Sequence, residues 1–390
     1  MGAGTGSGTD VDVDVDGDVD VDSGRDAGAG GGGSAPGVPA ARGGAGLPRH
    51  GVDGATFREL AAARGGAEAV RLLRAGQLSK RALLLLALRR GLPAADGGFA
   101  AAYRELGALR ETDPERWEQV LLRPELDAWA ADRLRALAAG AGAGVGAGAG
   151  GTGVPLGGLG EFVRGGPVGE PVRLECDGLR WTPLLDHAGP RRADYGRPVT
   201  GPLGAAGLDS WRGALAGAWE VLVRRHRPHA EAVAACVSVL VPLRPAPDGS
   251  AVSAAARRAY GAVAASLPAE PVLLALALVH EFLHVQLGAL LDLVPLHHPN
   301  GAAVHHAPWR PDPRPVGALL QGAYAHLGVT GFWRAELAAG APGRERAERE
   351  YLRWRVHTGA ALATLAASGE LTTAGSAFVA EMARAVRAFE

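Results

Sequence analysis

The residues best suited to chemistry form an HEXXH pattern, with His280, Glu281 and His284 in the segment Leu278-Val-His-Glu-Phe-Leu-His-Val-Gln286. The apolar neighbours and the length of this segment predict a buried helix. Residues four apart share one helix face, so both imidazoles can reach one metal ion, while Glu281 points about 100° round the helix. The pattern therefore predicts a metal site.

The surroundings favour a metal over a pair of hydrogen-bonded core histidines, which is the alternative. Burying two imidazoles and a carboxylate in an apolar helix is costly unless they are paired or metal-bound. Ala277 and Gly288 flank the two histidines on the same face and leave room for a ligand. Seven of the twelve histidines fall between His280 and His326.

Known zinc-protease patterns do not supply an obvious third ligand. A metzincin is excluded, because Leu287 and Leu290 stand where it needs Gly and His. A thermolysin-like site needs a glutamate on a following helix, and the first one available is Glu336. His297 and His298 lie a helix length from the motif, roughly 20 Å at 1.5 Å per residue, and are poor candidates.

His326 is the preferred third ligand. It lies within Val316–Leu337, which has the apolar spacing of a second helix, and Gly322 one turn earlier would let two helices approach closely. With the motif histidines it would leave metal positions open. A role as a core or helix-end histidine is the alternative.

Two arginines stand between these predicted helices, in Ala307-Pro-Trp-Arg-Pro-Asp-Pro-Arg-Pro315. The alternating prolines fix an extended backbone from which Arg310 and Arg314 project. Arginine forks recognise carboxylates by paired hydrogen bonds, and a keto acid that chelates a metal needs such a partner for its distal carboxylate. The alternative is a structural stretch whose arginines meet solvent or Asp312.

The elements that must position these groups are mainly helical. Apolar residues recur at helical spacing over Thr56–Ala139 and Leu208–Arg225, and again from about Val263 to the end. Short strands are expected in Val154–His187, and the Val-rich stretch Ala232–Leu243 predicts a buried strand. The predicted fold is mainly α with a small β component (α+β), a helical bundle that carries HEXXH on a buried helix.

Composition divides the chain into four parts. Seven aspartates in thirteen positions predict a disordered Asp/Gly-rich tail over 1–50, followed by an N-terminal helical region over 51–139. Eight glycines in fourteen residues mark 140–153 as a Gly-rich linker. The HEXXH catalytic region is expected over 154–390.

Charge and cysteine content narrow the partners and the compartment. The 40 basic and 41 acidic residues give a net charge of −1 without a basic tract, so no nucleic-acid partner is expected. Polar residues interrupt Pro271–Val294, so no membrane partner is expected either. Cys176 and Cys236 are isolated and no leader is apparent, which fits a reducing cytoplasm.

At these residues the chain resembles a known family, the α-ketoglutarate-dependent HEXXH-type peptide β-hydroxylases. The resemblance is strongest over about Val233–Arg334 and only general in the helical N-terminal half. The matching stretches are Ala264–Pro268, Val279–Leu296, Ala307–Pro315 and Leu320–Arg334.

The resemblance implies a bacterial tailoring enzyme that acts on a ribosomally made precursor peptide, its expected partner, alongside other peptide-maturation enzymes. It would use Fe(II), dioxygen and 2-oxoglutarate to hydroxylate an unactivated β-carbon, on a fold other than the double-stranded β-helix. Arg310 or Arg314 would bind 2-oxoglutarate, with Arg314 preferred.

Carried over by position, the same resemblance assigns iron binding to His280 and His284, with His326 as the candidate third ligand. Glu281 matches the motif glutamate, for which we expect a supporting role beside the ligands. Three protein ligands on an octahedral iron leave two positions for the keto acid and one for dioxygen.

Two other functions are compatible with the residues alone. A zinc metallopeptidase would use Glu281 as a base and needs one open metal position for water. A metal-stabilised peptide-binding module would use the same ligands without turnover. The sequence alone does not choose, because Glu281 is present in each case.

Overall fold

The structure is a computed structural model, and it describes seven stretches of the chain: residues 50–92, 97–139, 158–166, 168–190, 192–299, 303–340 and 343–389. Across them the fold is mainly α with a small β component, as the sequence predicts. Apart from His50, the predicted tail over 1–50 lies outside the described residues, and so does the predicted linker over 140–153. The division into domains therefore stays a prediction.

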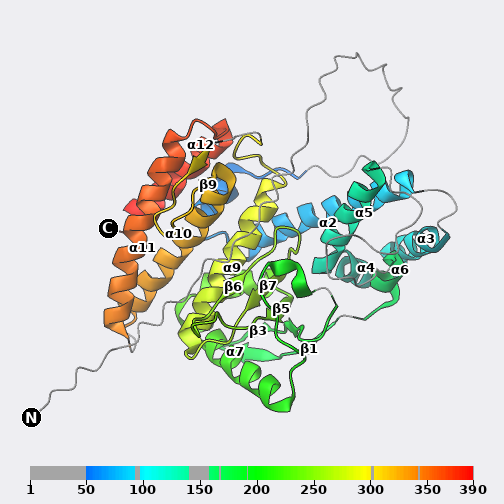
Figure 1. Ribbon diagram of the computed structural model, residues 1–390, viewed down its shortest axis with the longest axis horizontal. Coiled ribbons are helices and arrows are strands. Elements are labelled where there is room, and N and C mark those ends of the chain that lie inside the picture. Colours follow the sequence, from blue (N-terminus) through cyan, green and yellow to red (C-terminus); the bar gives the residue numbers. More distant parts are fainter. Residues whose placement is uncertain are drawn as a thin grey trace, which may run out of the picture.

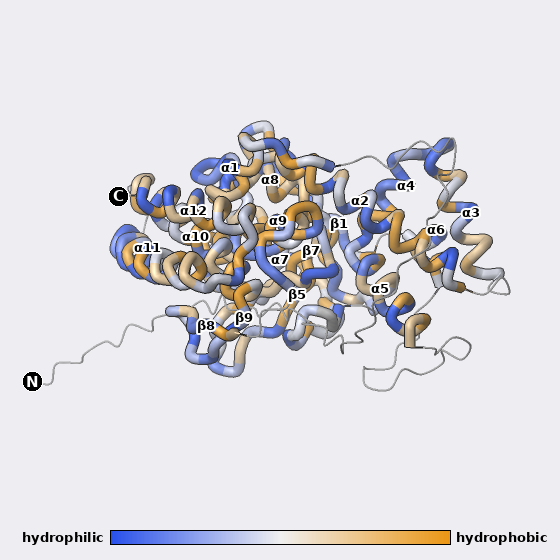
Figure 2. The backbone as a smooth tube through the Cα atoms, turned by 90° about the horizontal axis from the view of Figure 1, so that it is seen from above, coloured by the Kyte–Doolittle hydropathy of each residue, from blue (hydrophilic) through white to orange (hydrophobic). Residues whose placement is uncertain are grey.

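The HEXXH segment forms the central helix, α9 (Pro271–Leu291), which runs through the middle of the molecule (Figure 1). Pro271 occupies its first turn, where the missing N–H costs no hydrogen bond. Every residue from Leu273 to Leu290 is buried, so the helix is covered on all sides. In Figure 2 it lies within the apolar centre of the fold. Such a helix is stable only where other elements pack around its whole circumference.

Burial also explains why α9 has the composition of a membrane-spanning helix. It is long and apolar enough to cross a bilayer, but 94% of its most apolar window is buried inside the protein. The core helix of a soluble protein has this pattern of composition and burial.

A mixed five-stranded sheet packs beside α9 in the order β1-β4-β5-β7-β6. Strands β4, β5 and β7 run parallel, and the outer strands β1 and β6 are antiparallel to their neighbours. Two-stranded pairs β2–β3 and β8–β9 lie outside this sheet. The strand bounds are β1 Glu170–Pro171, β2 Leu174–Cys176, β3 Leu179–Trp181, β4 Leu184–Leu185, β5 Val239–Pro242, β6 Ser253–Ala254, β7 Ala262–Ala265, β8 Val304–His305 and β9 Arg314–Pro315.

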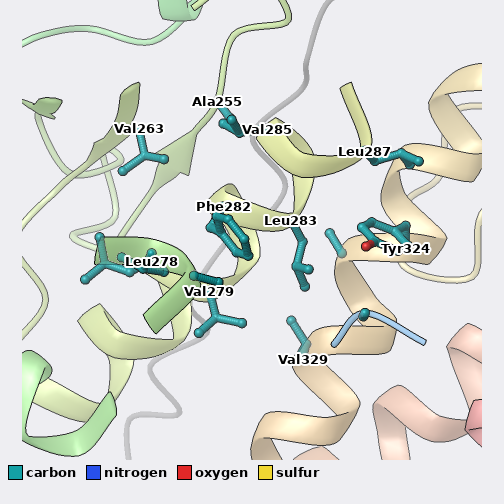
Figure 3. Close-up of a cluster of buried hydrophobic side chains, with 14 of the residues drawn as sticks. Ala255, Val263, Leu278, Val279, Phe282, Leu283, Val285, Leu287, Tyr324 and Val329 are labelled. Carbon is teal, nitrogen blue, oxygen red and sulfur yellow. The ribbon is translucent and has the colours of Figure 1, made fainter. Parts of the chain in front are cut away.

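The C-terminal helices cover another side of α9. Helix α10 (Val316–Ala338) packs against both α9 and α11 (Arg344–Ala367), and α12 (Thr373–Arg387) packs on α11. Figure 3 shows Leu283 of α9 beside α10, with Val263 of the sheet on the opposite side of α9. The two helices cross closely at Gly328, where an added Cβ would lie only 2.0 Å from Cδ1 of Leu283. A glycine at this crossing brings the α10 backbone against α9.

The N-terminal helices extend away from this core along α2, whose first half packs with α8 and α9. Its second half belongs to a smaller apolar core shared with α3, α4, α5 and α6, at the far end of the molecule in Figure 1. The bounds are α1 Gly54–Ala61, α2 Gly66–Gly91, α3 Gly97–Thr112, α4 Pro114–Leu121, α5 Pro124–Ala138 and α6 Leu159–Arg164.

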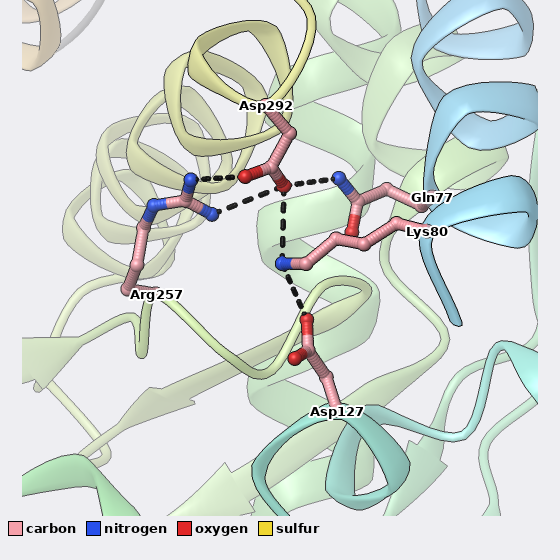
Figure 4. A network of polar contacts seen from close by, with 5 residues as sticks. All are labelled: Gln77, Lys80, Asp127, Arg257 and Asp292. Atoms are coloured by element: carbon pink, nitrogen blue, oxygen red, sulfur yellow. Dashed lines mark hydrogen bonds and ion pairs between the residues drawn. The ribbon is translucent and has the colours of Figure 1, made fainter. Parts of the chain in front are cut away.

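A network of charged and polar side chains fixes α2 to the end of α9 (Figure 4). Asp292, the C-terminal cap of α9, accepts hydrogen bonds from Gln77 (2.7 Å) and Lys80 (3.1 Å) of α2 and from Arg257. Lys80 also pairs with Asp127 of α5 at 2.7 Å. The network therefore joins the core helix to both parts of the N-terminal region.

Two stretches differ from the sequence prediction. Helix was expected from about Val263, but β7 extends to Ala265 and α9 begins only at Pro271. Ala232–Leu243 is not one strand, because α8 (Arg227–Cys236) occupies its first part and only Val239–Pro242 forms β5. Pro228 in the first turn starts this helix directly after α7 (Ala205–Arg225). Packing against α2 and α9 overrides the strand preference of the Val-rich run.

The close crossing at Gly328 predicts the effect of one added methyl group. Gly328→Ala should lower the free energy of unfolding by about 1–3 kcal/mol, because the Cβ can fit only if the buried side chain of Leu283 or the two helices shift. Gly331→Ala in the same helix is the matched control, since its Cβ would make an ordinary 3.5 Å contact with Phe389. Urea unfolding measures both changes, and equal stability of the two variants would contradict the close approach.

A half-buried histidine predicts acid sensitivity. Burial, with His226 nearby, lowers the pKa of His229 from 6.5 to about 4, and its Nε2 lies 3.0 Å from the carbonyl oxygen of Ala63. Between these two pH values the unfolded chain binds a proton that the folded protein does not, so stability falls as the pH drops from about 6.5 to 4. Urea unfolding of His229→Gln at pH 7 and pH 5 should show a weaker pH dependence than the wild type, by up to one proton. A dependence unchanged from the wild type would contradict this assignment.

Candidate metal centre

The two motif histidines converge as the helical spacing predicts. Nε2 of His280 and Nε2 of His284 lie 3.0 Å apart, and the two rings meet at 69° with their centroids 4.8 Å apart. Both side chains are buried, with exposed fractions of 1% and 8%. Two imidazole nitrogens thus face the same point on one side of α9.

Helix α10 adds His326 to this pair. Its ring centroid lies 5.2 Å from that of His280, at an interplanar angle of 73°. Two tryptophans enclose His326, with Trp354 of α11 stacked at 4.1 Å and Trp309 at 4.3 Å. The structure therefore brings the three sequence-predicted histidines together in an aromatic setting.

Hydrogen bonds orient two of the three rings. Nδ1 of His284 lies 3.2 Å from Oε1 of Gln321, and Nδ1 of His326 lies 2.8 Å from the carbonyl oxygen of Gly322. Both acceptors require a proton on Nδ1, which leaves the Nε2 lone pair available for a metal. Nε2 of His326 is buried and has no hydrogen-bond partner among the described residues.

Burial keeps these imidazoles neutral. It lowers the pKa of His284 to about 4 and that of His326 to about 3, and it holds the pKa of His280 well below 6.5. The neighbouring imidazoles of His284 and His326 lower the pKa of His280 further. Neutral imidazole is the form that binds a metal, so the three side chains are in the correct protonation state near neutral pH.

The donor set fits a metal ion in part. As the side chains stand, the described part of the chain has no group of three His, Cys, Asp or Glu residues that could hold one ion. His280 and His284 present two converging nitrogens, and the ring of His326 lies beside them. A three-histidine site therefore requires the ring of His326 to turn toward the other two.

Glu281 is directed elsewhere. Oε1 of Glu281 lies 2.6 Å from Oγ of Ser253 on β6, so the carboxyl group faces the sheet. Burial raises the pKa of Glu281 to about 8, partly offset by the Ser253 hydrogen bond and by Arg197. The carboxyl group therefore links α9 to β6, and its recorded hydrogen bond is to the sheet and not to the histidines.

The two arginines of the Pro-rich stretch both face the same carboxylate. Nε of Arg310 lies 2.8 Å from Oδ1 of Asp312, and Nε of Arg314 lies 3.1 Å from Oδ2. Trp309, the residue before Arg310, packs on His326 and brings this stretch beside the centre. The interactions recorded between these side chains match the structural alternative, and the cosubstrate role of both arginines stays a prediction.

The glutamate considered for a thermolysin-like site, Glu336, has other partners. Glu336 is buried at the other end of α10, where its Oε1 lies 2.7 Å from Nε2 of His226 and 3.0 Å from Nε of Arg225. His226 is also stacked on Phe332 at 3.9 Å. Two partners thus hold Glu336 ten residues beyond His326.

Sequence reasoning missed four residues that shape the centre. Gln321 and Ser253 hold the polar groups of α9, and Trp309 and Trp354 enclose His326. Gln321 could have been found, because it is a polar residue in an otherwise apolar helix, five positions before His326. Trp354 gives no such signal, since only the packing of α11 on α10 brings it there.

Comparison with known proteins does not identify the chain. Neither the search of protein-family models nor that of curated proteins finds a match. The functional assignment must therefore rest on the residues of the centre.

The geometry predicts a graded loss of metal affinity. His326→Ala should abolish stoichiometric Fe(II) binding, because it removes the third nitrogen. Gln321→Ala should weaken binding by about 10–100-fold, since losing the acceptor at Nδ1 leaves the ring of His284 unoriented. Anaerobic titration with metal analysis measures both.

The exposed His306 provides the control. His306→Ala removes an imidazole directly before the Pro-rich stretch Ala307–Pro315, and it should leave metal binding unchanged. Full stoichiometric binding by His326→Ala would transfer the third-ligand role to another residue.

Proposed function

We propose that this chain is an Fe(II)- and 2-oxoglutarate-dependent dioxygenase that hydroxylates β-carbons of residues in a ribosomally synthesised precursor peptide. The observation that carries the proposal is the group of three neutral, buried imidazoles, two of which present Nε2 atoms 3.0 Å apart. The peptide substrate is supported by the resemblance of the four sequence stretches described above, and the cytoplasm is the compartment we propose.

The two nitrogens lie close enough together for one ion to bind both. Their Nε2 atoms are 3.0 Å apart, in a hydrogen bond between the two rings. With metal–nitrogen bonds of about 2.1 Å, adjacent ligands of one ion lie about 3.0–3.4 Å apart. An octahedral ion with three protein ligands keeps three positions for a chelating acid and dioxygen.

The residues around the centre orient the imidazoles and exclude water from them. Gln321 orients the ring of His284, while Trp309 and Trp354 cover His326 and keep water from its faces. When bound, iron with its keto acid would supply the oxidising power for attack on an unactivated carbon. A dry, aromatic setting limits side reactions of such an oxidant.

The position of Glu281 weakens the zinc metallopeptidase alternative. A peptidase base must hydrogen-bond the water on the metal. Here the carboxyl group of Glu281 is hydrogen-bonded to Ser253 on the opposite side of α9 from α10. Its position supports a role in holding the helix to the sheet.

The hydroxylase proposal predicts oxygen-dependent turnover. With Fe(II) and a candidate precursor peptide, the protein should convert 2-oxoglutarate to succinate, and the peptide should gain the mass of one oxygen. Succinate analysis and mass spectrometry of the peptide check both products, with an anaerobic reaction and His284→Ala as controls. Tight zinc binding, indifference to 2-oxoglutarate and peptide cleavage without oxygen would contradict the proposal.

A further inference from the structure

A narrow pocket lies on the side of the centre formed by His284. Its walls come from α9, from α2, from Gln321 of α10 and from the segment between β6 and β7. His280 and His326 are each 1% exposed, whereas His284 is 8% exposed and lines this pocket. The lining residues are Gln77, Ala255, Ala256, Arg257, Tyr260, His284, Val285, Gly288, Ala289 and Gln321.

The side chains of His284 and Arg257 both line the pocket. Gly288 lies one helical turn, about 6 Å, beyond His284 on α9. A Cβ on Gly288 would lie 3.5 Å from Cδ of Arg257, so the absence of a side chain there lets Arg257 lie against the helix. A five-carbon dicarboxylate spans about 5–6 Å between its ends, from ordinary carbon–carbon bond lengths. Its length matches the distance along α9.

Arg257 belongs to a cluster of charged side chains at the end of α9. Its Nη2 lies 2.5 Å from Oδ1 of Asp292, whose other oxygen also accepts from Lys80 and Gln77 (Figure 4). Lys80 pairs in addition with Asp127. The two carboxylates of the cluster are therefore already shared between Lys80 and Arg257.

Arg81 adds a third cation to this cluster, without a hydrogen-bonding partner. It is 0% exposed, and none of its three guanidinium nitrogens has a hydrogen-bond partner among the described residues. Its Cζ lies 5.7 Å from the ring centroid of Tyr260, which lines the pocket. The carboxylates of Asp127, Asp292 and Glu125 act on it electrostatically without a hydrogen bond to it. A buried guanidinium without hydrogen bonds is costly, and a nearby anion would compensate it.

We propose that this pocket binds a small dicarboxylate, with Arg257 holding the carboxylate remote from the metal and Arg81 supplying the compensating charge beneath Tyr260. The inference rests on the proposed function, in which the dicarboxylate is 2-oxoglutarate. It moves the cosubstrate role away from Arg310 and Arg314, neither of which lines this pocket.

The pocket must widen to admit its ligand. Its interior, about 10 Å³, has room for a single water molecule. The volume rises to about 310 Å³ only when the solvent-filled space at the open mouth is counted. Arg257 is 30% exposed at this mouth and can swing toward solvent, while Asp292 keeps Lys80 and Gln77 as partners. The side chain that moves is thus the one that binds the carboxylate.

The test measures binding of two acids to the full chain by calorimetry, with and without Mn(II). The probes are 2-oxoglutarate, which can chelate a metal, and glutarate, which lacks the keto oxygen. Arg257→Gln should weaken both at least 10-fold, because it removes a charged, two-pronged hydrogen bond. Arg258→Gln, which removes the neighbouring charge paired with Asp132 at 3.8 Å, should change binding by less than twofold.

A second variant separates ligand binding from folding. Arg81→Met replaces the buried charge by an apolar side chain of similar length, and it should leave the melting temperature of the ligand-free protein unchanged or higher. It should nevertheless weaken glutarate binding at least 5-fold. A purely structural role for Arg81 would instead lower the melting temperature and leave the affinity of the folded fraction unchanged.

Failure of the pocket and failure of the proposed function give different results. Glutarate binding that depends on Arg257, without iron-dependent succinate formation, would support the pocket and refute the hydroxylase. Turnover with an unchanged KM for 2-oxoglutarate in Arg257→Gln would refute the pocket alone. Loss of binding in Arg314→Gln, or no binding of either acid to the wild-type protein, would also overturn the pocket.

Discussion

The complete burial of α9 is the constraint on which the rest of the structure depends. A helix without a solvent-facing side cannot hydrate its polar residues, so each must find a partner on a different element. Glu281 meets Ser253 on β6, and Gln286 accepts a hydrogen bond from Tyr324 on α10 at 2.8 Å. His284 meets Gln321 and His280. The polar residues of α9 therefore fix the sheet on one side and α10 on the other.

Some of the groups that remain unsatisfied lie where chemistry is proposed. Nε2 of His326 is buried without a partner in the described part of the chain, and so is the guanidinium of Arg81. Native proteins rarely leave such groups buried without a reason, because each costs free energy. A cation beside the imidazole and an anion near the guanidinium would satisfy both. The low polarity of the interior raises the free-energy cost of leaving these groups unpaired, and it would also strengthen their binding to ligands.

The sequence predicted much of the fold and part of the site. Periodicity located α10 within one residue of the structure at its C-terminal end, and the HEXXH spacing placed two imidazoles on one face of a buried helix. It failed over Ala232–Leu243, where the contacts of α8 with α2 and α9 override the strand preference of valine. For Arg310 and Arg314 it left two roles open, and the contacts with Asp312 match the structural alternative.

What the sequence determined by itself is local. The HEXXH spacing fixes the i and i+4 geometry through the backbone of a single helix, and the apolar run dictates that this helix is buried. Which groups meet across elements was decided only by the tertiary structure. His326 reaches His280, Trp354 stacks on His326, and Arg257 lies against Gly288, because elements distant in sequence pack at particular crossings. Side chains set these crossings jointly, so no single segment of the chain encodes them.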